Sequence, residues 1–228
     1  MVDIKNHDFK NLYWVTLKDG NIRLATKNAN PGQKVYTERL ISEEGVEYRT
    51  FDPYKSKLGA SIFKKLSIFP FEENSKILYL GAASGTTVSH VSDIIGDEGA
   101  IYAVEFSTRS IRDLILLAEK RKNIIPIHSD ARFPEEYSII VPKVDMVYED
   151  VAQPTQAEIL DTNIKAYLKE GGYFFLAVKS RSIDVTKDPQ VIYKEVIAKL
   201  ESSGLKVLET IDLEPYEKDH VMIVGQKQ

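Results

Sequence analysis

A glycine-rich turn between an apolar run and a helical pattern constrains the fold of this chain more than any other feature. The apolar run 76–80 ends in the turn Gly81-Ala82-Ala83-Ser84-Gly85, and a second apolar run, 100–105, ends in the acid Glu105. In open α/β sheets this layout brings the backbone of the first turn close to a nucleoside-containing ligand and sets a carboxylate against ribose hydroxyls at the second strand end. We therefore expect a mainly parallel sheet, covered by helices, with a ligand-binding edge.

The same turn favours one class of cofactor over another. A dinucleotide site usually has the pattern Gly-x-Gly-x-x-Gly, which lets a pyrophosphate rest on a helix N-terminus. Here Ala83 stands at the middle glycine position. S-adenosylmethionine has a ribose and an adenine but no phosphate, so the turn favours that cofactor. A plain strand–turn–helix with small residues for packing is the alternative that this segment leaves open.

Composition excludes several classes of protein. The chain has 228 residues, of which 43% are hydrophobic, which suits one α/β domain with a small extra unit. No apolar stretch is long enough to span a membrane, and the first residues lack the apolar core of a signal peptide. There is no cysteine, and the histidines lack metal-ligand spacing, so we expect no metal site. The net charge of -4 disfavours an autonomous nucleic-acid binder.

The first part of the chain, 1–52, is expected to form a small antiparallel β unit. A turn signal at 18–21 separates the strand patterns 12–17 and 22–26, and a second turn separates 35–41 from 46–50. Two hairpins are too small to be stable alone, so this unit should pack on the domain that follows.

The remainder, 53–228, is expected to form the cofactor-binding domain. Its predicted helices are 57–66, 87–95, 108–122, 156–169 and 189–202, and its predicted strands are 76–80, 100–105, 123–128, 143–149, 171–179, 205–213 and 220–226. The last two strands are joined by a short connection, which implies an antiparallel pair. An α/β, Rossmann-like sheet that ends in an antiparallel hairpin is typical of class I S-adenosylmethionine-dependent methyltransferases and not of dehydrogenases.

Four strand ends should meet at one edge of this sheet, where open α/β folds bind ligands. Glu105 is expected to accept hydrogen bonds from the ribose hydroxyls and Phe106 to cover the adenine. Asp130 is expected to accept from the adenine amino group. The candidate cofactor-binding residues are Gly81, Ala83, Thr86, Thr87, Glu105, Phe106, Asp130, Ala131, Asp150, Val151, Ala152 and Gln153.

Three further residues stand out near the same edge. Lys179 ends the most hydrophobic strand, where a surface lysine that caps the strand is the alternative. Lys57 opens a predicted helix and by itself suits a surface position. His220 opens the last strand, and its alternative is a partly buried packing histidine.

Several motifs resemble the fibrillarin family, in its archaeal form. They are Tyr-Arg-Thr-Phe-Asp-Pro-Tyr-Lys-Ser-Lys-Leu at 48–58, Leu-Gly-Ala-Ala-Ser-Gly-Thr-Thr at 80–87, Val-Glu-Phe-Ser at 104–107, Asp-Val-Ala-Gln-Pro at 150–154 and Asp-His at 219–220. The resemblance covers essentially the whole chain. The Gly/Arg-rich extension of eukaryotic fibrillarins is missing, which favours an archaeal, cytoplasmic protein.

The resemblance implies an RNA 2′-O-methyltransferase that uses S-adenosyl-L-methionine and acts on rRNA and tRNA. It further implies a box C/D guide ribonucleoprotein, in which a Nop-family scaffold protein and a kink-turn-binding ribosomal-type protein hold the enzyme and the guide RNA. The net charge agrees with this arrangement, because base pairing to the guide then selects the target. The catalytic residues that the family implies are Lys57, Asp150, Lys179 and His220.

The implied chemistry requires a 2′-hydroxyl to be aimed at a methyl group and to lose its proton as the new bond forms. Lys179 is the candidate base, or else it only steers the hydroxyl. Two alternatives remain open at this point. A small-molecule O-methyltransferase would commonly carry clustered acids for a divalent metal, a pattern that we do not find. A non-catalytic scaffold with a relic cofactor fold would not be expected to keep all four catalytic residues.

Overall fold

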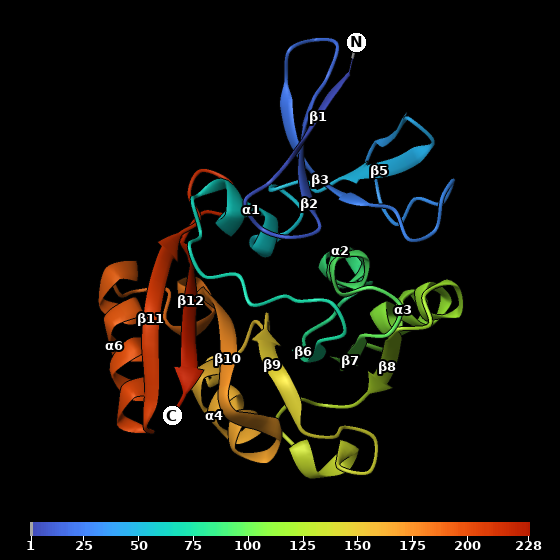
Figure 1. Ribbon diagram of the computed structural model, residues 1–228. Coiled ribbons are helices and arrows are strands. Elements are labelled where there is room, and N and C mark those ends of the chain that lie inside the picture. Colours follow the sequence, from blue (N-terminus) through green and yellow to red (C-terminus); the bar gives the residue numbers. More distant parts are fainter. Residues whose placement is uncertain (1) are drawn as a thin grey trace.

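The computed structural model describes residues 2–228 as two β-sheets with helices packed around the larger one (Figure 1). The smaller sheet is antiparallel, with strand order β1-β2-β3-β5-β4. Its strands are β1 (Asp3–Asn6), β2 (Leu12–Thr16), β3 (Ile22–Lys27), β4 (Leu40–Glu43) and β5 (Val46–Thr50). Within residues 2–228, no helix has both the length and the apolar character needed to cross a membrane.

The larger sheet is mixed and has seven strands in the order β11-β12-β10-β9-β6-β7-β8. The strands are β6 (Lys76–Leu80), β7 (Ala100–Glu105), β8 (Ile124–His128), β9 (Val144–Glu149), β10 (Leu168–Lys179), β11 (Leu205–Asp212) and β12 (His220–Lys227). Pairing is parallel from β10 through β9, β6 and β7 to β8, and β12 is antiparallel to both β10 and β11. The α/β class with a C-terminal antiparallel hairpin is therefore confirmed.

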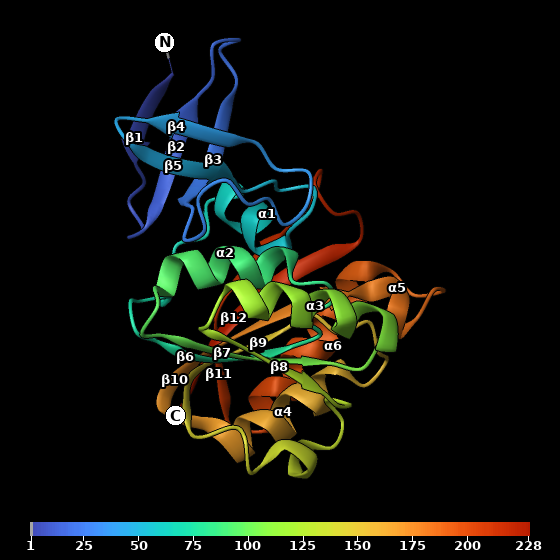
Figure 2. The ribbon, with the colours of Figure 1, turned by 90° about the vertical axis from the view of Figure 1, so that its right-hand side faces the viewer.

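Helices cover both faces of the larger sheet, as Figure 2 shows with α2 and α3 on one side and α4 on the other. They are α1 (Lys57–Phe63), α2 (Thr86–Ile95), α3 (Thr108–Lys120), α4 (Gln156–Tyr167), α5 (Ser180–Ile183) and α6 (Pro189–Ser202), with a 3-10 turn η1 at Pro134–Tyr137. Because both faces are covered, the central strand β6 is buried and apolar from Ile77 to Leu80 and does not alternate with polar residues.

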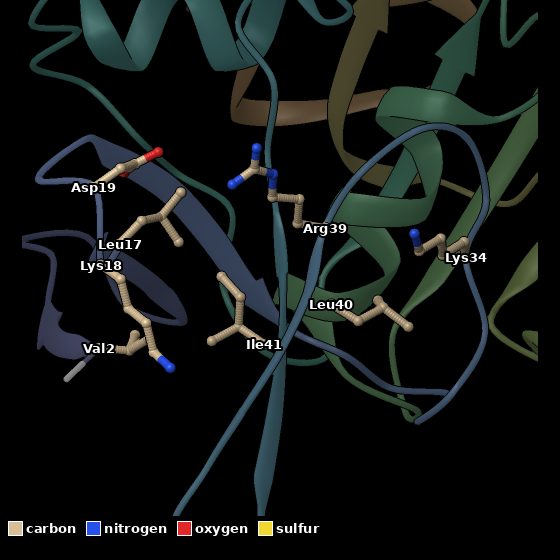
Figure 3. Close-up of a pocket in the computed structure, with 8 residues that line it drawn as sticks. All are labelled: Val2, Leu17, Lys18, Asp19, Lys34, Arg39, Leu40 and Ile41. Atoms are coloured by element: carbon tan, nitrogen blue, oxygen red, sulfur yellow. The ribbon is translucent and has the colours of Figure 1, made fainter.

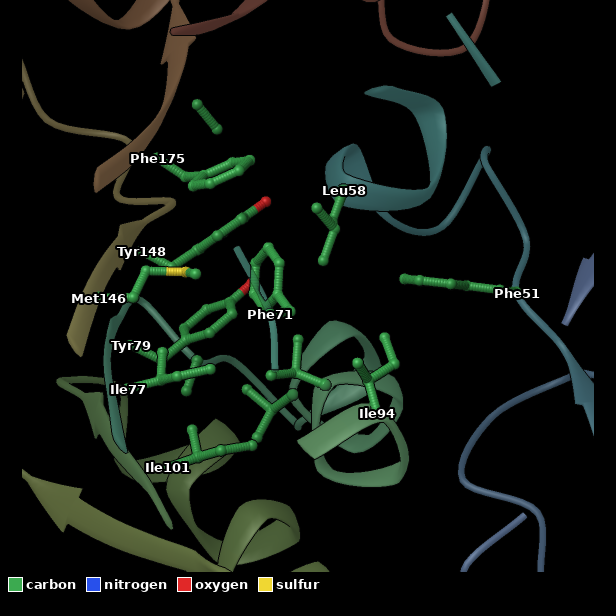
Figure 4. Close-up of a cluster of buried hydrophobic side chains, with 14 of the residues drawn as sticks. Phe51, Leu58, Phe71, Ile77, Tyr79, Ile94, Ile101, Met146, Tyr148 and Phe175 are labelled. Carbon is green, nitrogen blue, oxygen red and sulfur yellow. The ribbon is translucent and has the colours of Figure 1, made fainter. Parts of the chain in front are cut away.

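Alternate residues of the central strand β6 enter two separate cores. Ile77 and Tyr79 pack toward α1 and α2, in a cluster with Met146 and Phe175 (Figure 4). Leu78 and Leu80 point to the opposite face, toward α4 and α6. Phe51, at the end of the smaller sheet, belongs to the first of these cores. The two sheets therefore share buried apolar surface, which stabilises the smaller one.

Buried ion pairs join the smaller sheet to α2. Arg49 of β5 lies 3.1 Å from a Glu38 carboxylate oxygen and 2.8 Å from one of Asp93, and all three side chains are fully buried. Arg121 lies 2.6 Å from the other Asp93 oxygen. Since the desolvation of such charges offsets much of their attraction, we interpret this cluster as fixing the position of the sheet on α2 more than as a source of net stability.

His90 of α2 lies in the same buried region and stacks on Phe51, with ring centroids 4.0 Å apart. Its two ring nitrogens lie 2.9 Å from the Thr26 hydroxyl and 2.8 Å from the Tyr36 hydroxyl. Thr26 donates its own proton to Asp93 at 2.7 Å, and Tyr36 donates its own to the Thr50 carbonyl at 3.0 Å, so both hydroxyls are held by further partners. Burial and the nearby Arg49 and Arg121 guanidinium groups lower the pKa of His90 well below 6.5.

The strand predicted at 35–41 is wrong, because β4 begins only at Leu40. The backbone N–H groups of Val35 and Tyr36 donate to the Glu38 carboxylate at 2.7 and 2.8 Å, which holds this segment in a turn. The strand β1, Asp3–Asn6, was not predicted, because its short polar sequence has no apolar alternation.

Candidate active site

The turn after β6 approaches the end of β9 so closely that only glycine fits at its first position. Gly81 has φ +80°, and a Cβ there would lie 2.4 Å from the Asp150 carbonyl oxygen. The N–H groups of Gly81 and Ala82 both donate to the Val104 carbonyl, at 3.0 and 3.1 Å. The ends of β6, β7 and β9 are thus held together at one edge of the sheet, as expected for an open α/β fold.

A hollow of about 290 Å³ opens at this edge. Its lining includes residues from the ends of all four parallel strands predicted to meet there. Ten of the twelve candidate cofactor-binding residues line it: Gly81, Ala83, Glu105, Phe106, Asp130, Ala131, Asp150, Val151, Ala152 and Gln153. Phe106 is 70% exposed, so its ring face is available to a flat ligand.

Glu105 is fixed in place by the backbone on either side of it. One carboxylate oxygen accepts from the Ala83 N–H at 2.7 Å, and the other accepts from the Ser107 N–H at 2.7 Å. Each oxygen keeps further acceptor capacity, because a carboxylate oxygen has two lone pairs. The side chain can therefore hold the turn and still accept hydrogen bonds from ligand hydroxyls.

Asp130 is paired with Arg132, a residue that the sequence reasoning missed. Arg132 donates from Nε at 3.0 Å and from Nη2 at 2.6 Å to one carboxylate oxygen. These hydrogen bonds lower the pKa of Asp130 below its usual value. The position of Arg132, in the same turn and only just beyond the acid, is the signal that could have revealed the pair. Because Arg132 also lines the hollow, a ligand there meets a neutral pair and not a lone carboxylate.

Thr86 and Thr87 begin α2 and do not line the hollow. Thr87 is buried and donates from its hydroxyl to the Ser56 hydroxyl at 2.9 Å. Ser56 in turn accepts from the Gly59 N–H at 3.2 Å as the N-cap of α1. Thr87 therefore helps to fix the helix that begins with Lys57, while contact of the two threonines with a cofactor stays a prediction.

Lys57 and Asp150 form an ion pair beside the hollow. The Lys57 Nζ atom lies 2.9 and 3.0 Å from the two Asp150 carboxylate oxygens, and the two side chains are 19% and 25% exposed. The Asp150 N–H donates to the Leu80 carbonyl at 2.9 Å, so this acid is tied to the central strand. The pair is half-buried, and it connects α1 with the end of β9.

His220 and Lys179 lie at the same edge, directly opposite each other. They are the paired residues at the ends of β12 and β10. The His220 ring is buried, and its Nδ1 lies 2.7 Å from the Lys218 carbonyl. Burial lowers the pKa of His220, and the positive charge of Lys57 lowers it further. Lys179 is exposed, so its amine can meet a solvent-borne substrate.

Glu149, next to Asp150, is a buried acid that the sequence reasoning missed. Its side chain is fully buried, and neither carboxylate oxygen has a hydrogen-bond partner among residues 2–228. Burial, with Asp150 adding to the effect, raises the pKa of Glu149 well above 4.5. The sequence signal was an acid that directly follows the apolar run Met146-Val147-Tyr148 within the same strand.

Neither a hollow on the smaller sheet nor a metal-binding cluster adds to this site. One hollow on the smaller sheet is lined by Leu17, Lys34 and Arg39 among others (Figure 3), and contains none of the candidate site residues. Within residues 2–228, no three histidine, aspartate or glutamate side chains lie close enough to hold a metal ion.

Comparison with known proteins identifies the family. The fibrillarin family model matches residues 4–228. A fibrillarin-like rRNA/tRNA 2′-O-methyltransferase from Pyrococcus furiosus is 56% identical over 227 residues, covering 100% of both chains. The crystal structure of Aeropyrum pernix fibrillarin with natively bound S-adenosyl-L-methionine is 49% identical, with a TM-score of 0.92 over 98% of this chain and 97% of that one. The fibrillarin of a fibrillarin/Nop5p complex is 41% identical, with a TM-score of 0.85 over 96% of this chain and 98% of that one. The chain belongs to the fibrillarin family.

Proposed function

We propose that this protein transfers a methyl group from S-adenosyl-L-methionine to ribose 2′-hydroxyls of rRNA and tRNA. The observation that carries the proposal is the ion pair between Lys57 and Asp150, because Asp150 itself lines the hollow. His220 and Lys179 are paired at the ends of neighbouring strands on the same edge of the sheet. The same activity is printed in the name of the Pyrococcus furiosus relative.

The hollow fits the cofactor. The absence of a side chain at Gly81 leaves the backbone accessible, and a Cβ there would collide with the Asp150 carbonyl. Glu105 supplies a carboxylate fixed by two backbone donors, and the exposed Phe106 ring supplies an apolar face. A related fibrillarin holds S-adenosyl-L-methionine in its crystal structure. When bound, the cofactor supplies an electrophilic methyl group on a sulfonium.

The residues at the edge orient the nucleophile and take up its proton. Asp150 holds Lys57 at 2.9 Å, which fixes the ammonium group beside the hollow. Burial lowers the pKa of His220 and so favours its neutral ring. The residue is therefore expected to act through hydrogen bonds and not through a positive charge. Lys179 faces solvent at the end of β10 and is the candidate to accept the hydroxyl proton or to steer the hydroxyl. Transfer would place the methyl on the ribose oxygen and the proton on the base, while the broken S–C bond would leave its electron pair on sulfur as a neutral thioether.

The enzyme acts within a larger assembly under this proposal. A related fibrillarin forms a complex with Nop5p, so a Nop-family scaffold protein is the expected partner. A box C/D guide RNA selects the target nucleotide, and a kink-turn-binding protein holds that guide. The net charge of -4 supports this division, because the 30 lysines and arginines are outnumbered by 34 acids and leave no net positive charge to hold RNA.

The test is methyl transfer in a complex reconstituted with a Nop-family protein, a kink-turn-binding protein and a guide RNA. Radiolabelled S-adenosyl-L-methionine should label only the nucleotide that the guide specifies. A target with a 2′-deoxyribose at that nucleotide is the matched control and should take no label. Label on the deoxy target, or none on the normal target, would refute the proposal.

A further inference from the structure

Two buried polar side chains flank the loop between β9 and α4, and three of their oxygen atoms lack a partner. Glu149 is the last residue of β9, Gln156 is the first of α4, and both side chains are fully buried. Within the described residues 2–228, the two Glu149 carboxylate oxygens and Gln156 Oε1 have no hydrogen-bond partner. Because such atoms are costly and therefore rare in folded proteins, three of them at the ends of one loop indicate a contact that an ionised carboxylate cannot make.

The loop between these two residues forms one wall of the cofactor hollow. Its residues 150–153 all line the hollow, whereas Glu149 and Gln156 do not. Over the part of the chain that the structure describes, the N-cap residue Thr155 gives α4 no side-chain hydrogen bond. Instead, Gln156 Nε2 donates to the Gln153 carbonyl at 3.3 Å. The Gln156 side chain therefore ties the start of α4 to the wall of the hollow.

Glu149 points to the face of the sheet that α4 covers (Figure 2). Alternate residues of a strand share a face, and Val147, two residues earlier, packs in the core that contains Ile159 of α4. Burial, and then the negative charges of Asp150 and Glu158, raise the pKa of Glu149 well above 4.5. Since Glu158 lies in the first turn of α4, the Glu149 carboxyl group lies near the start of that helix and keeps its proton.

We propose that the Glu149 carboxyl group donates a hydrogen bond to Gln156 Oε1 and thereby holds the loop 150–155 in the shape that binds the cofactor. A protonated carboxyl group has one O–H donor and an amide oxygen only accepts, so the two groups are complementary. This single proton supplies a partner for two of the three unpartnered oxygens. Glu149 and Gln156 are then positioning residues, because the residues between them line the hollow and they do not. The inference rests on the cofactor-binding part of the proposed function.

Infrared spectroscopy of the full chain at neutral pH tests the hydrogen bond itself. The wild type should show the C=O stretching band of a protonated carboxyl group, and Glu149→Gln should lack it. Gln156→Leu should move this band to higher frequency, because a carboxyl group that no longer donates a hydrogen bond has a stiffer C=O bond. Glu158→Gln, which removes an exposed acid from the first turn of α4, is the control and should leave the band in place. Absence of the band from the wild type, or an unmoved band in Gln156→Leu, would overturn the inference.

Calorimetry with S-adenosyl-L-methionine tests the positioning role. Glu149→Leu should raise the Kd about 10-fold, the effect of one lost hydrogen bond, because the cofactor must then order the loop. Glu149→Gln should keep the wild-type Kd, since its amide can donate to Gln156 in the same way. In a Gln156→Leu background, Glu149→Leu should raise the Kd no further, as expected for two residues that act through one contact.

The outcomes separate this inference from the proposed function. A wild-type Kd in Glu149→Leu, or weaker binding by Glu149→Gln, would overturn the positioning role while the wild type still binds the cofactor. A wild type that does not bind S-adenosyl-L-methionine would refute the proposed function and the positioning role with it. The infrared result would still decide whether the hydrogen bond exists.

Discussion

Replacing Gly81 by alanine should destabilise the protein through a collision at the candidate active site. Gly81 and Gly20 have nearly the same backbone conformation, with φ of +80° and +81°. A Cβ at Gly20 meets nothing within 4 Å, whereas one at Gly81 lies 2.4 Å from the Asp150 carbonyl oxygen and 3.1 Å from a Val151 methyl. Gly20→Ala is therefore a control for the backbone strain alone.

The magnitudes follow from these two environments. A left-handed conformation costs an alanine about 1–2 kcal/mol, so the free energy of unfolding should fall by this amount in both variants. Overpacking that forces the backbone to move costs about 1–3 kcal/mol more, and this further loss of stability should occur only in Gly81→Ala. Gly81→Ala should thus lower the free energy of unfolding by about 2–5 kcal/mol.

Urea unfolding of the two variants and the wild type measures the difference, and calorimetry with S-adenosyl-L-methionine should show weaker binding for Gly81→Ala only. Equal destabilisation by the two substitutions, with equal cofactor affinity, would refute the argument that the turn after β6 must approach the end of β9.

Three further predictions concern charge. Glu149→Gln should stabilise the protein increasingly as the pH rises from 5 to 7, by up to about 1.4 kcal/mol per pH unit, because the folded wild type keeps a proton that the unfolded chain releases above 4.5. Urea unfolding measures the difference in stability between Glu149→Gln and the wild type, and a difference that does not change with pH would contradict this prediction. Glu98→Gln, at an exposed position, is the control. His90 should act in the opposite sense, since only the unfolded chain takes up its proton below 6.5. The wild type should therefore lose stability, relative to His90→Gln, as the pH falls from 6.5 to 5. Finally, the net charge of -4 predicts that the chain alone binds free RNA weakly at physiological salt. Tight, salt-sensitive binding in a gel shift would contradict this prediction.

The sequence was enough to predict the parallel core of the fold because its signals are local. The strands β6 and β7 match their predicted bounds, since each is an apolar run that ends at a turn or an acid. The segment at 35–41 was misread because apolar spacing alone does not reveal that Glu38 accepts from two backbone N–H groups.

The residues of the candidate site were predictable from the sequence, but their side-chain contacts were not. The residues that line the hollow were predictable because each follows a strand end, and strand ends meet at one edge. The pairing of Asp130 with Arg132 and the orientation of Thr87 toward Ser56 were not predictable, because both depend on which way a side chain turns. The unpartnered state of Glu149 depends on the packing around it and was equally hidden.

The most direct test of the account separates cofactor binding from methyl transfer in two variants of the reconstituted complex. Glu105→Ala should raise the Kd for S-adenosyl-L-methionine, since the loss of charge-assisted hydrogen bonds costs about 1.5–3 kcal/mol, while keeping substantial turnover at saturating cofactor. Lys179→Ala should keep the wild-type Kd in calorimetry and nearly abolish turnover. Lys179→Arg keeps the positive charge but cannot accept a proton, so it should also be inactive if Lys179 is the base. Near-wild-type turnover by Lys179→Arg would leave this lysine only a steering role. Near-wild-type turnover by Lys179→Ala, or an unchanged Kd for Glu105→Ala, would contradict the assignment of this edge of the sheet as the active site.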